Sequence, residues 1–231
     1  MRSAFTAILA SLALAACAVA PLPPPPAPAD ALPSPQQAVD NFATVVRDVE
    51  PMAERFCQAE APRQNCDFLI TVDTTRGQPP NAFQTVDRSG RPVVVFTVAL
   101  IAETRNRDEI AFILGHEAAH HIRGHIPRTQ ESAVTGAVLG GILASIGGAS
   151  GDAIRVAQDI GATVGARAFS KEFELEADTL GTRIAFGAGY DPVLGAQYFS
   201  RIDDPGNVFL GTHPPNAQRI EAVRRTAAAL R

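Results

Sequence analysis

The chain has 231 residues, of which 46% are hydrophobic and 19% charged, and its formal net charge is -4. This length suits one domain with short appendages and is long enough to bury a hydrophobic core. The chain is weakly acidic and has no block of Lys or Arg, so it offers no basic surface that would bind nucleic acid. Its balanced composition excludes a wholly disordered chain. Its 3 cysteines are too few for a disulfide scaffold. We therefore expect a globular enzyme or binding protein that has no nucleic-acid partner.

The N-terminus carries the features of an export signal. Arg2 is followed by a short apolar run over residues 4–16, which ends in Leu-Ala-Ala immediately before Cys17. A membrane-spanning helix needs about 20 apolar residues, whereas a shorter run with a basic start is typical of a secretory signal peptide. The ending resembles the bacterial lipobox, in which Cys17 would be acylated and become the mature N-terminus. The alternative is an ordinary signal peptide that contains a cysteine.

A proline-rich stretch separates this signal from the remainder of the chain. Residues 21–35 include eight prolines, a composition that favours an extended polyproline II conformation. At about 3.1 Å per residue, such a tether reaches roughly 45 Å. These features divide the chain into a lipoprotein signal peptide, a lipidated tether and a folded domain, over residues 1–16, 17–37 and 38–231.

Export and lipidation predict a periplasmic protein that is held at a membrane by its lipid anchor. Ala18, rather than Asp, follows the acylated cysteine, which favours the outer over the inner membrane. With Cys17 acylated, Cys57 and Cys66 are the two cysteines that remain available to pair. In an oxidising compartment, a pair this close in sequence is expected to form a disulfide.

The first part of the folded domain combines one helix with three strands. Residues 36–57 carry apolar side chains at helical spacing, which predicts a helix. Residues 67–72 and 92–100 are rich in branched apolar side chains and predict strands. A further strand over 82–86 precedes a turn, so it should form an antiparallel hairpin with the strand that begins at residue 92.

Beyond the hairpin the pattern is helical. Asn106 is a suitable N-cap for a helix over residues 107–123, because Glu109 follows it at the capping-box distance, and Gly124 should end this helix. Residues 132–151 contain no charged side chain but hold six glycines. We expect a helical hairpin or lid over residues 132–165 that lies against the domain, with contact to a membrane surface as the alternative.

The residues Gly115-His116-Glu117-Ala118-Ala119-His120 contain the pattern His-Glu-x-x-His inside the predicted helix. Positions four apart lie on one face of a helix, so His116 and His120 can offer two imidazoles to one metal ion. Glu117 then lies beside the metal, where bound water would be. A chance match in a chain of this composition is expected only about 0.005 times.

A catalytic zinc needs a third protein ligand and an open coordination position. The metzincin pattern fails, because Arg123 and Ile126 occupy the positions where it requires glycine and histidine, and His125 lies one residue early. A carboxylate from a second helix is the remaining source.

Glu174 and Asp178 are four residues apart and share a helix face. Apolar residues next to them direct this face inward, whereas Glu172 and Glu176 fall elsewhere on the helix and are expected to be solvated. Spacing alone leaves an exposed acidic helix as an open alternative. A buried carboxylate, however, is costly unless it is paired or bound to a metal.

Three separated motifs together resemble a known family. They are His116-Glu117-x-x-His120, Ser170-x-x-x-Glu174-x-x-Ala177-Asp178, and Thr212-His213-Pro214-Pro215 followed by Arg219-Ile220. In this order they resemble the HtpX-like and CAAX-prenyl-endopeptidase-like zinc metallopeptidases, of the gluzincin type, and especially their soluble periplasmic members, which include lipoproteins. The resemblance covers residues 38–231 and includes the segments 81–83 and 189–192.

With the predicted elements, the resemblance implies a mostly helical α+β, zincin-like domain. A small antiparallel sheet is expected, and the two metal-binding helices should pack together around one zinc ion per chain. The residues implied for the site are the zinc ligands His116, His120 and Glu174, the general base Glu117, the carboxylate Asp178 that orients a ligand histidine, the active-site residues His213 and Arg219, and the substrate-binding residues Asn81, Ala82 and Phe83.

The expected activity is that of a zinc-dependent endopeptidase of the bacterial cell envelope. Glu117 would activate a zinc-bound water, and His213 or Arg219 would help to stabilise the oxyanion. The expected partners are unfolded or misassembled polypeptides, which would add as an extended strand to the edge of the hairpin over 82–98. The glycine-rich composition and position of residues 132–165 also motivate the hypothesis that they restrain access to the metal. A periplasmic chaperone or assembly factor with a masked or structural zinc site is one alternative, and a hydrolase of non-peptide amides is another.

Overall fold

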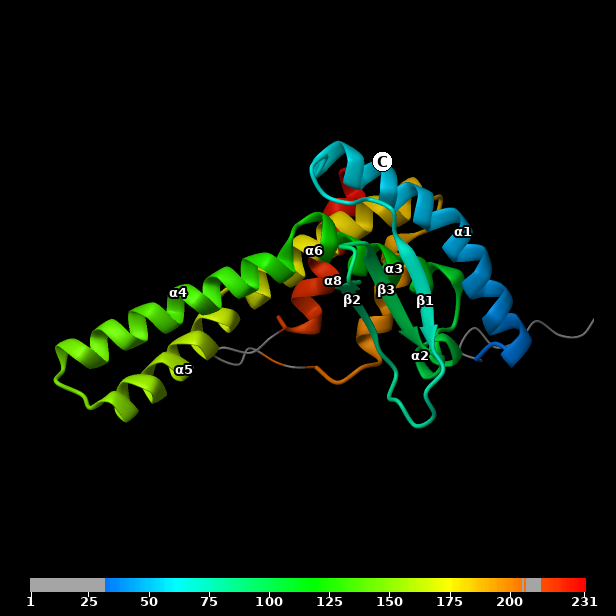
Figure 1. Ribbon diagram of the computed structural model, residues 1–231. Helices are drawn as coiled ribbons and strands as arrows, with labels where there is room; N and C mark the ends of the chain where they lie inside the picture. Colours follow the sequence, from blue (N-terminus) through cyan, green and yellow to red (C-terminus); the bar gives the residue numbers. More distant parts are fainter. Residues whose placement is uncertain (1–31, 205, 207–212) are drawn as a thin grey trace, which may run out of the picture. The chain divides into compact units, whose positions relative to one another are not determined.

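Helices dominate the computed structural model, which describes residues 32–204, 206 and 213–231 (Figure 1). The predicted signal peptide, Cys17 and most of the predicted tether lie outside the described residues, as does Thr212. The elements in chain order are α1 (Pro35–Glu60), β1 (Leu69–Asp73), β2 (Ala82–Val86), β3 (Pro92–Thr97), α2 (Val98–Glu103), α3 (Arg107–Ile122), α4 (His125–Ile146), α5 (Gly151–Ala168), α6 (Ser170–Gly187), α7 (Pro192–Gly195), the short 3-10 helix η1 (Ala196–Ser200) and α8 (Asn216–Ala228). This arrangement confirms the expected mostly helical α+β class.

Helix α1 begins with a complete capping box. The Ser34 hydroxyl accepts a hydrogen bond from the Gln37 backbone N–H, and the Gln37 side chain accepts one from the Ser34 backbone N–H. Pro35 occupies the first turn, where its missing N–H costs nothing. The helix confirms the predicted one over 36–57 and continues to Glu60.

The three strands form a mixed sheet with the order β1-β3-β2. Strands β2 and β3 pair antiparallel, with Ala82 opposite Phe96, as the hairpin prediction requires. Strand β1 pairs with β3 in parallel, with Leu69 opposite Val93, so the expectation of a purely antiparallel sheet was wrong. The reason is that β3, largely buried, lies in the centre, and the chain passes from one of its sides to the other between β1 and β2.

The strand predicted over 92–100 ends earlier than expected. The Thr97 hydroxyl accepts a hydrogen bond from the Leu100 backbone N–H at 3.2 Å and thereby caps α2. This local hydrogen bond converts the last residues of the predicted strand into the first turn of a helix. The same hydroxyl donates to the Pro79 carbonyl and accepts from the Asn81 backbone N–H, so it also fixes the start of β2.

Helix α3 lies at the centre of the domain. The Asn106 side chain accepts a hydrogen bond from the Glu109 backbone N–H at 2.9 Å, which confirms the predicted cap. Most residues of α3 are buried, and they occur on all faces of the helix, as expected for a helix surrounded by other elements. It ends at Ile122, and Gly124 takes a φ of 64°, which glycine adopts without steric cost and which turns the chain into α4.

Helices α3 and α6 approach each other backbone to backbone. A Cβ atom added to Gly115 would lie 2.8 Å from the Gly181 carbonyl oxygen, and one added to Gly181 would lie 2.7 Å from the backbone nitrogen of His116. Two glycines therefore bring the helix that carries the His-Glu-x-x-His pattern next to the helix that carries Glu174.

Replacement of Gly181 by alanine is expected to destabilise the domain. The added Cβ meets backbone atoms of α3, which cannot rotate away, so we expect the free energy of unfolding to fall by about 1–3 kcal/mol. Urea unfolding measures this loss. Gly151→Ala is the matched control, because its Cβ would meet nothing within 4 Å at the start of α5. Equal stability of the two variants would contradict the close approach of α3 and α6.

Helices α4 and α5 form a hairpin through a seam of small residues. Gly136 and Gly140 of α4 face Gly161 and Gly165 of α5, so closely that a Cβ atom at Gly136 would collide with the Gly161 carbonyl. Figure 1 shows the two helices side by side as a hairpin. No helix in the described parts of the chain is long and apolar enough to span a membrane.

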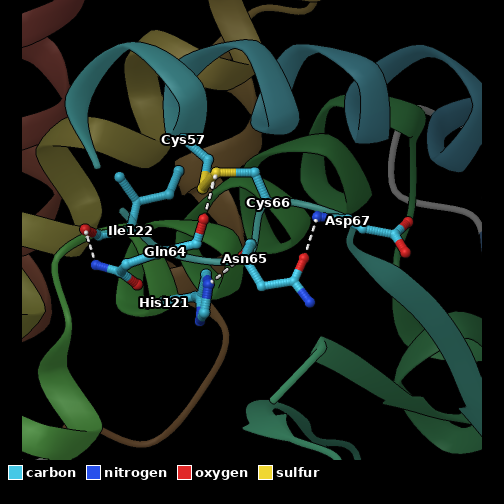
Figure 2. Close-up of a disulfide and its surroundings, with 7 residues drawn as sticks. All are labelled: Cys57, Gln64, Asn65, Cys66, Asp67, His121 and Ile122. Carbon is cyan, nitrogen blue, oxygen red and sulfur yellow. Dashed lines mark hydrogen bonds between the residues drawn. A yellow bond between two sulfur atoms is a disulfide. The ribbon is translucent and has the colours of Figure 1, made fainter. Parts of the chain in front are cut away.

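A disulfide between Cys57 and Cys66 joins the end of α1 to the following loop (Figure 2). The loop also holds the last turn of α3. The Gln64 side chain donates to the Ile122 carbonyl at 3.2 Å, and the His121 ring donates from Nε2 to the Asn65 carbonyl at 2.7 Å. The disulfide therefore stabilises a loop that contacts the helix that carries His116 and His120.

Removal of this disulfide is expected to lower stability without unfolding the protein at room temperature. Closing a loop of this length contributes about 3 kcal/mol in the chain-entropy model. The double variant Cys57→Ser/Cys66→Ser should therefore melt roughly 6–12 °C lower than the wild type. Dithiothreitol should lower the wild-type melting temperature similarly and leave that of the variant unchanged. An unchanged melting temperature, both in the double variant and in the wild type with dithiothreitol, would contradict the assigned role of the disulfide.

Candidate metal centre

Three side chains from two helices converge on one point. His116 and His120 lie one turn apart on α3, with their Nε2 atoms 3.0 Å from each other. Glu174 of α6 places Oε2 3.5 Å from His116 Nε2 and Oε1 3.5 Å from His120 Nε2. One atom from each residue lies within 4.8 Å of the others, so the structure brings together the three predicted ligands.

The spacing of these atoms fits a zinc ion. Zinc binds imidazole nitrogen at about 2.0–2.1 Å and carboxylate oxygen at about 2.0–2.2 Å in a tetrahedral arrangement. Ligand atoms at such distances lie roughly 3.3–3.5 Å from one another, close to the separations found here. Two imidazoles and one carboxylate are also a donor set of catalytic zinc sites, in which a fourth position stays open.

Asp178 and Arg219 hold His116 in place. His116 Nδ1 lies 3.0 Å from Asp178 Oδ1, so its N–H donates to this carboxylate and leaves Nε2 free for a metal. Asp178 has no solvent exposure, and Arg219 of α8 binds both of its oxygens, with Nε at 2.8 Å and a terminal nitrogen at 2.7 Å. The buried carboxylate is thereby paired in the bidentate geometry that stabilises such charges.

This network shifts the pKa values of its members. Burial alone would raise the pKa of Asp178, but hydrogen bonds from His116 and Arg219 hold it below its ordinary value. Burial alone would lower the pKa of His116, but its hydrogen bonds to Asp178 and Glu174 raise it to about 10.

The other two ligand residues are already in the form that binds a metal. Burial alone would raise the pKa of Glu174, but hydrogen bonds from His116 and His213 lower it, so the carboxylate is ionised. Burial, together with the neighbouring His116, lowers the pKa of His120 to about 3 and keeps its ring neutral.

Glu117 follows His116 in the chain and borders the cleft that leads to the ligands. Burial raises the pKa of its carboxyl group to about 7, although His116 and a hydrogen bond from the Gln84 backbone N–H act in the opposite direction. A carboxyl group with a pKa near neutrality can both accept and return a proton at physiological pH. This property suits the predicted general base.

The cleft has a volume of about 620 Å³ and runs past the edge of the sheet. Ala82 and Phe83 of β2 line it, as two of the predicted substrate-binding residues. The third, Asn81, does not line the cleft, and its backbone N–H bonds to the Thr97 side chain instead. Because β2 is an edge strand, the cleft is bordered by backbone groups that have no partner strand on that side.

The sequence of residues 40–227 matches the profile of peptidase family M48. The chain belongs to this family. Comparison with curated proteins gives no match. Peptidases of family M48 are metal-dependent, so the protein is a metallopeptidase, and the His116, His120 and Glu174 cluster is the group that could bind its metal. The family assignment confirms the resemblance to the HtpX-like enzymes.

Two further predicted residues of this M48 peptidase lie close to the same oxygen of Glu174. His213 is half-exposed at the cleft and places Nδ1 3.1 Å from Glu174 Oε2. Arg219 also borders the cleft but is buried, binds Asp178 and lies 3.4 Å from Glu174 Oε2. The geometry therefore makes Arg219 a positioning residue, whereas His213 has access to a substrate.

Sequence reasoning missed His125 and misplaced Glu176. His125, the first residue of α4, places Nδ1 2.8 Å from His120 Nδ1 and Nε2 3.1 Å from Glu176 Oε2. Glu176 was expected to be solvated. Instead, it bonds to His125 and also binds Arg128 at 2.6 Å. The available signal was a further histidine just after the helix-ending Gly124, where the chain folds back over α3.

The helical hairpin contributes little to the walls of the cleft. None of the residues 132–165 is among those that line the cleft. Only the first turns of α4 contribute, through His125, Ile126, Thr129 and Gln130. Helices α4 and α5 pack on each other along their glycine seam, and the predicted role of residues 132–165 as a lid stays a prediction.

Proposed function

We propose that this M48 metallopeptidase is a zinc-dependent endopeptidase of the bacterial cell envelope that cleaves unfolded or misassembled proteins. The observation that carries the proposal is the convergence of His116, His120 and Glu174 beside Glu117 in a cleft along β2. Zinc bound there would supply a Lewis acid that polarises the scissile carbonyl and lowers the pKa of water towards neutrality.

The residues around the ligands have the positions that peptide hydrolysis requires. The Glu117 carboxylate accepts a proton from the attacking water and returns it to the leaving amine. His213 lines the cleft beside Glu174, from where its ring would donate a hydrogen bond to the oxygen that gains negative charge.

The sheet edge supports a polypeptide substrate in an extended conformation. A peptide that adds to β2 satisfies its backbone groups through main-chain hydrogen bonds, as in other cases of strand addition. Folded proteins seldom offer such a free segment, so the arrangement favours unfolded or misassembled chains. The apolar lining of the cleft by Phe83, Phe112 and Phe199 favours substrates with hydrophobic side chains near the cleaved bond.

The proposed location rests on the sequence of the N-terminal segment. A short apolar run before Cys17 and a proline-rich stretch fit a lipid-anchored periplasmic protein, with the outer membrane favoured by Ala18. The Cys57–Cys66 disulfide is in keeping with an oxidising compartment. Export followed by labelling with radioactive palmitate, in the wild type and in Cys17→Ala, tests this part of the proposal.

Cleavage of an unfolded protein by the purified enzyme tests the activity. Reduced and alkylated α-lactalbumin should be cut at internal bonds, and the folded, disulfide-bonded form should be cut at least about ten times more slowly. A chelator should stop cleavage, and zinc should restore it. Cleavage that resists the chelator, or stepwise loss of terminal residues, would contradict a zinc endopeptidase. Zinc binding without any cleavage would favour the alternative of an assembly factor with a masked or structural site.

A further inference from the structure

The two ligand histidines are oriented in different ways. His116 donates directly to a carboxylate, that of Asp178. His120 instead meets another imidazole, with its Nδ1 2.8 Å from His125 Nδ1. A ligand histidine needs an acceptor for its second N–H, because this hydrogen bond fixes the tautomer and the ring orientation.

Counting protons along this second chain leaves one consistent arrangement. When Nε2 of His120 keeps its lone pair for a metal, the proton lies on Nδ1 and is donated to His125 Nδ1. His125 must then carry its own proton on Nε2. That N–H donates to Glu176 Oε2, at 3.1 Å, so both hydrogen bonds are satisfied by one pair of tautomers.

The members of this chain are held on all sides. Arg128 donates to both oxygens of Glu176, at 2.6 and 3.3 Å. The His125 ring is 4% exposed and stacks on the Phe173 ring, with the two centroids 4.6 Å apart. The Arg128 guanidinium lies 4.2 Å from the centre of the Phe173 ring. Both carboxylates that terminate the hydrogen-bond chains, Asp178 and Glu176, are thus themselves fixed by an arginine.

We propose that His125 is a positioning residue for the metal ligand His120, with Glu176 and Arg128 fixing its tautomer. The inference rests on the metal site of the proposed function. The acceptor at His125 Nδ1 prevents the His120 ring from rotating and keeps Nε2 directed at Glu174 and His116. Loss of an outer hydrogen-bond partner of this kind lowers metal affinity by roughly 10–100-fold.

Three variants separate a hydrogen-bonding role from a packing role. His125→Phe keeps the stacking on Phe173 but removes the acceptor, so its zinc affinity should fall by roughly 10–100-fold. His125→Asn retains an acceptor oxygen near the position of Nδ1 and should recover most of the affinity. His121→Phe is the matched control, because His121 of α3 is likewise a buried histidine but bonds to the Asn65 carbonyl.

The measurement is a competition titration of the full-length apoprotein with zinc and a chromophoric chelator, beside urea unfolding of each variant. The expected result is a higher zinc Kd for His125→Phe, near-wild-type values for His125→Asn and His121→Phe, and altered visible absorption of Co²⁺ only in His125→Phe. Equal zinc Kd values for wild type and His125→Phe would overturn the inference and leave the proposed function standing. A wild type that binds no zinc would overturn both.

Discussion

Glu117→Gln is expected to lower kcat/KM for peptide cleavage by about 10²–10⁴-fold while leaving zinc bound. The amide has nearly the shape of the carboxylate but cannot accept a proton from water. Burial raises the pKa of Glu117 to about 7, in the direction of the uncharged form, so a neutral amide of nearly the same shape suits this position. Steady-state kinetics with a quenched fluorescent peptide, together with zinc analysis of the same sample, measures both quantities.

Glu172→Gln provides the control for this experiment. Glu172 lies on α6, the helix of Glu174, but is exposed and does not line the cleft, so its replacement removes a charge without touching the site. Its kcat/KM should equal that of the wild type. A Glu117→Gln enzyme with normal activity, or one that has lost its zinc, would show that Glu117 is not the general base.

Arg219→Leu is expected to lower the free energy of unfolding by about 3–5 kcal/mol, more than the Gly181→Ala substitution. The substitution leaves the carboxylate of Asp178 without its partner in a position that has no solvent exposure. Because its partners hold the pKa of Asp178 below the ordinary value, their stabilising effect is present at neutral pH and is lost as the pH falls through the lowered pKa. The deficit of the variant should therefore be largest near neutral pH and shrink on acidification, as followed by urea unfolding.

The double variant Arg219→Leu/Asp178→Leu tests the cause of that loss. Removal of both charges leaves no unpaired ion, so the double variant should recover stability relative to Arg219→Leu alone. Its zinc affinity should nevertheless stay reduced, because His116 has lost the acceptor for its Nδ1–H. Strictly additive losses of stability would contradict a direct interaction between the two side chains.

Local patterns were sufficient to predict the centre of the site. The Asn106 cap and the apolar residues that follow it define α3, and the helical period then places His116 and His120 on one face. The inward direction of Glu174 followed from the apolar stripe beside it on α6. These features depend on neighbours within one or two turns, which a sequence displays directly.

Features that depend on distant segments could not be predicted in the same way. The parallel pairing of β1 with β3 arises from how the chain passes around β3, and no residue within β1 specifies it. Gly124 was recognised as a helix end, but its φ of 64° also carries His125 back to His120, a consequence visible only in three dimensions.

The central claim is that Glu174 completes a metal site with His116 and His120. Anomalous diffraction at the zinc edge from crystals of the zinc-loaded protein tests it most directly. The predicted result is one ion per chain within about 2.0–2.2 Å of Nε2 of both histidines and of a carboxylate oxygen of Glu174. An ion bound elsewhere, or bound to the histidines with the Glu174 carboxylate directed away from it, would contradict the claim.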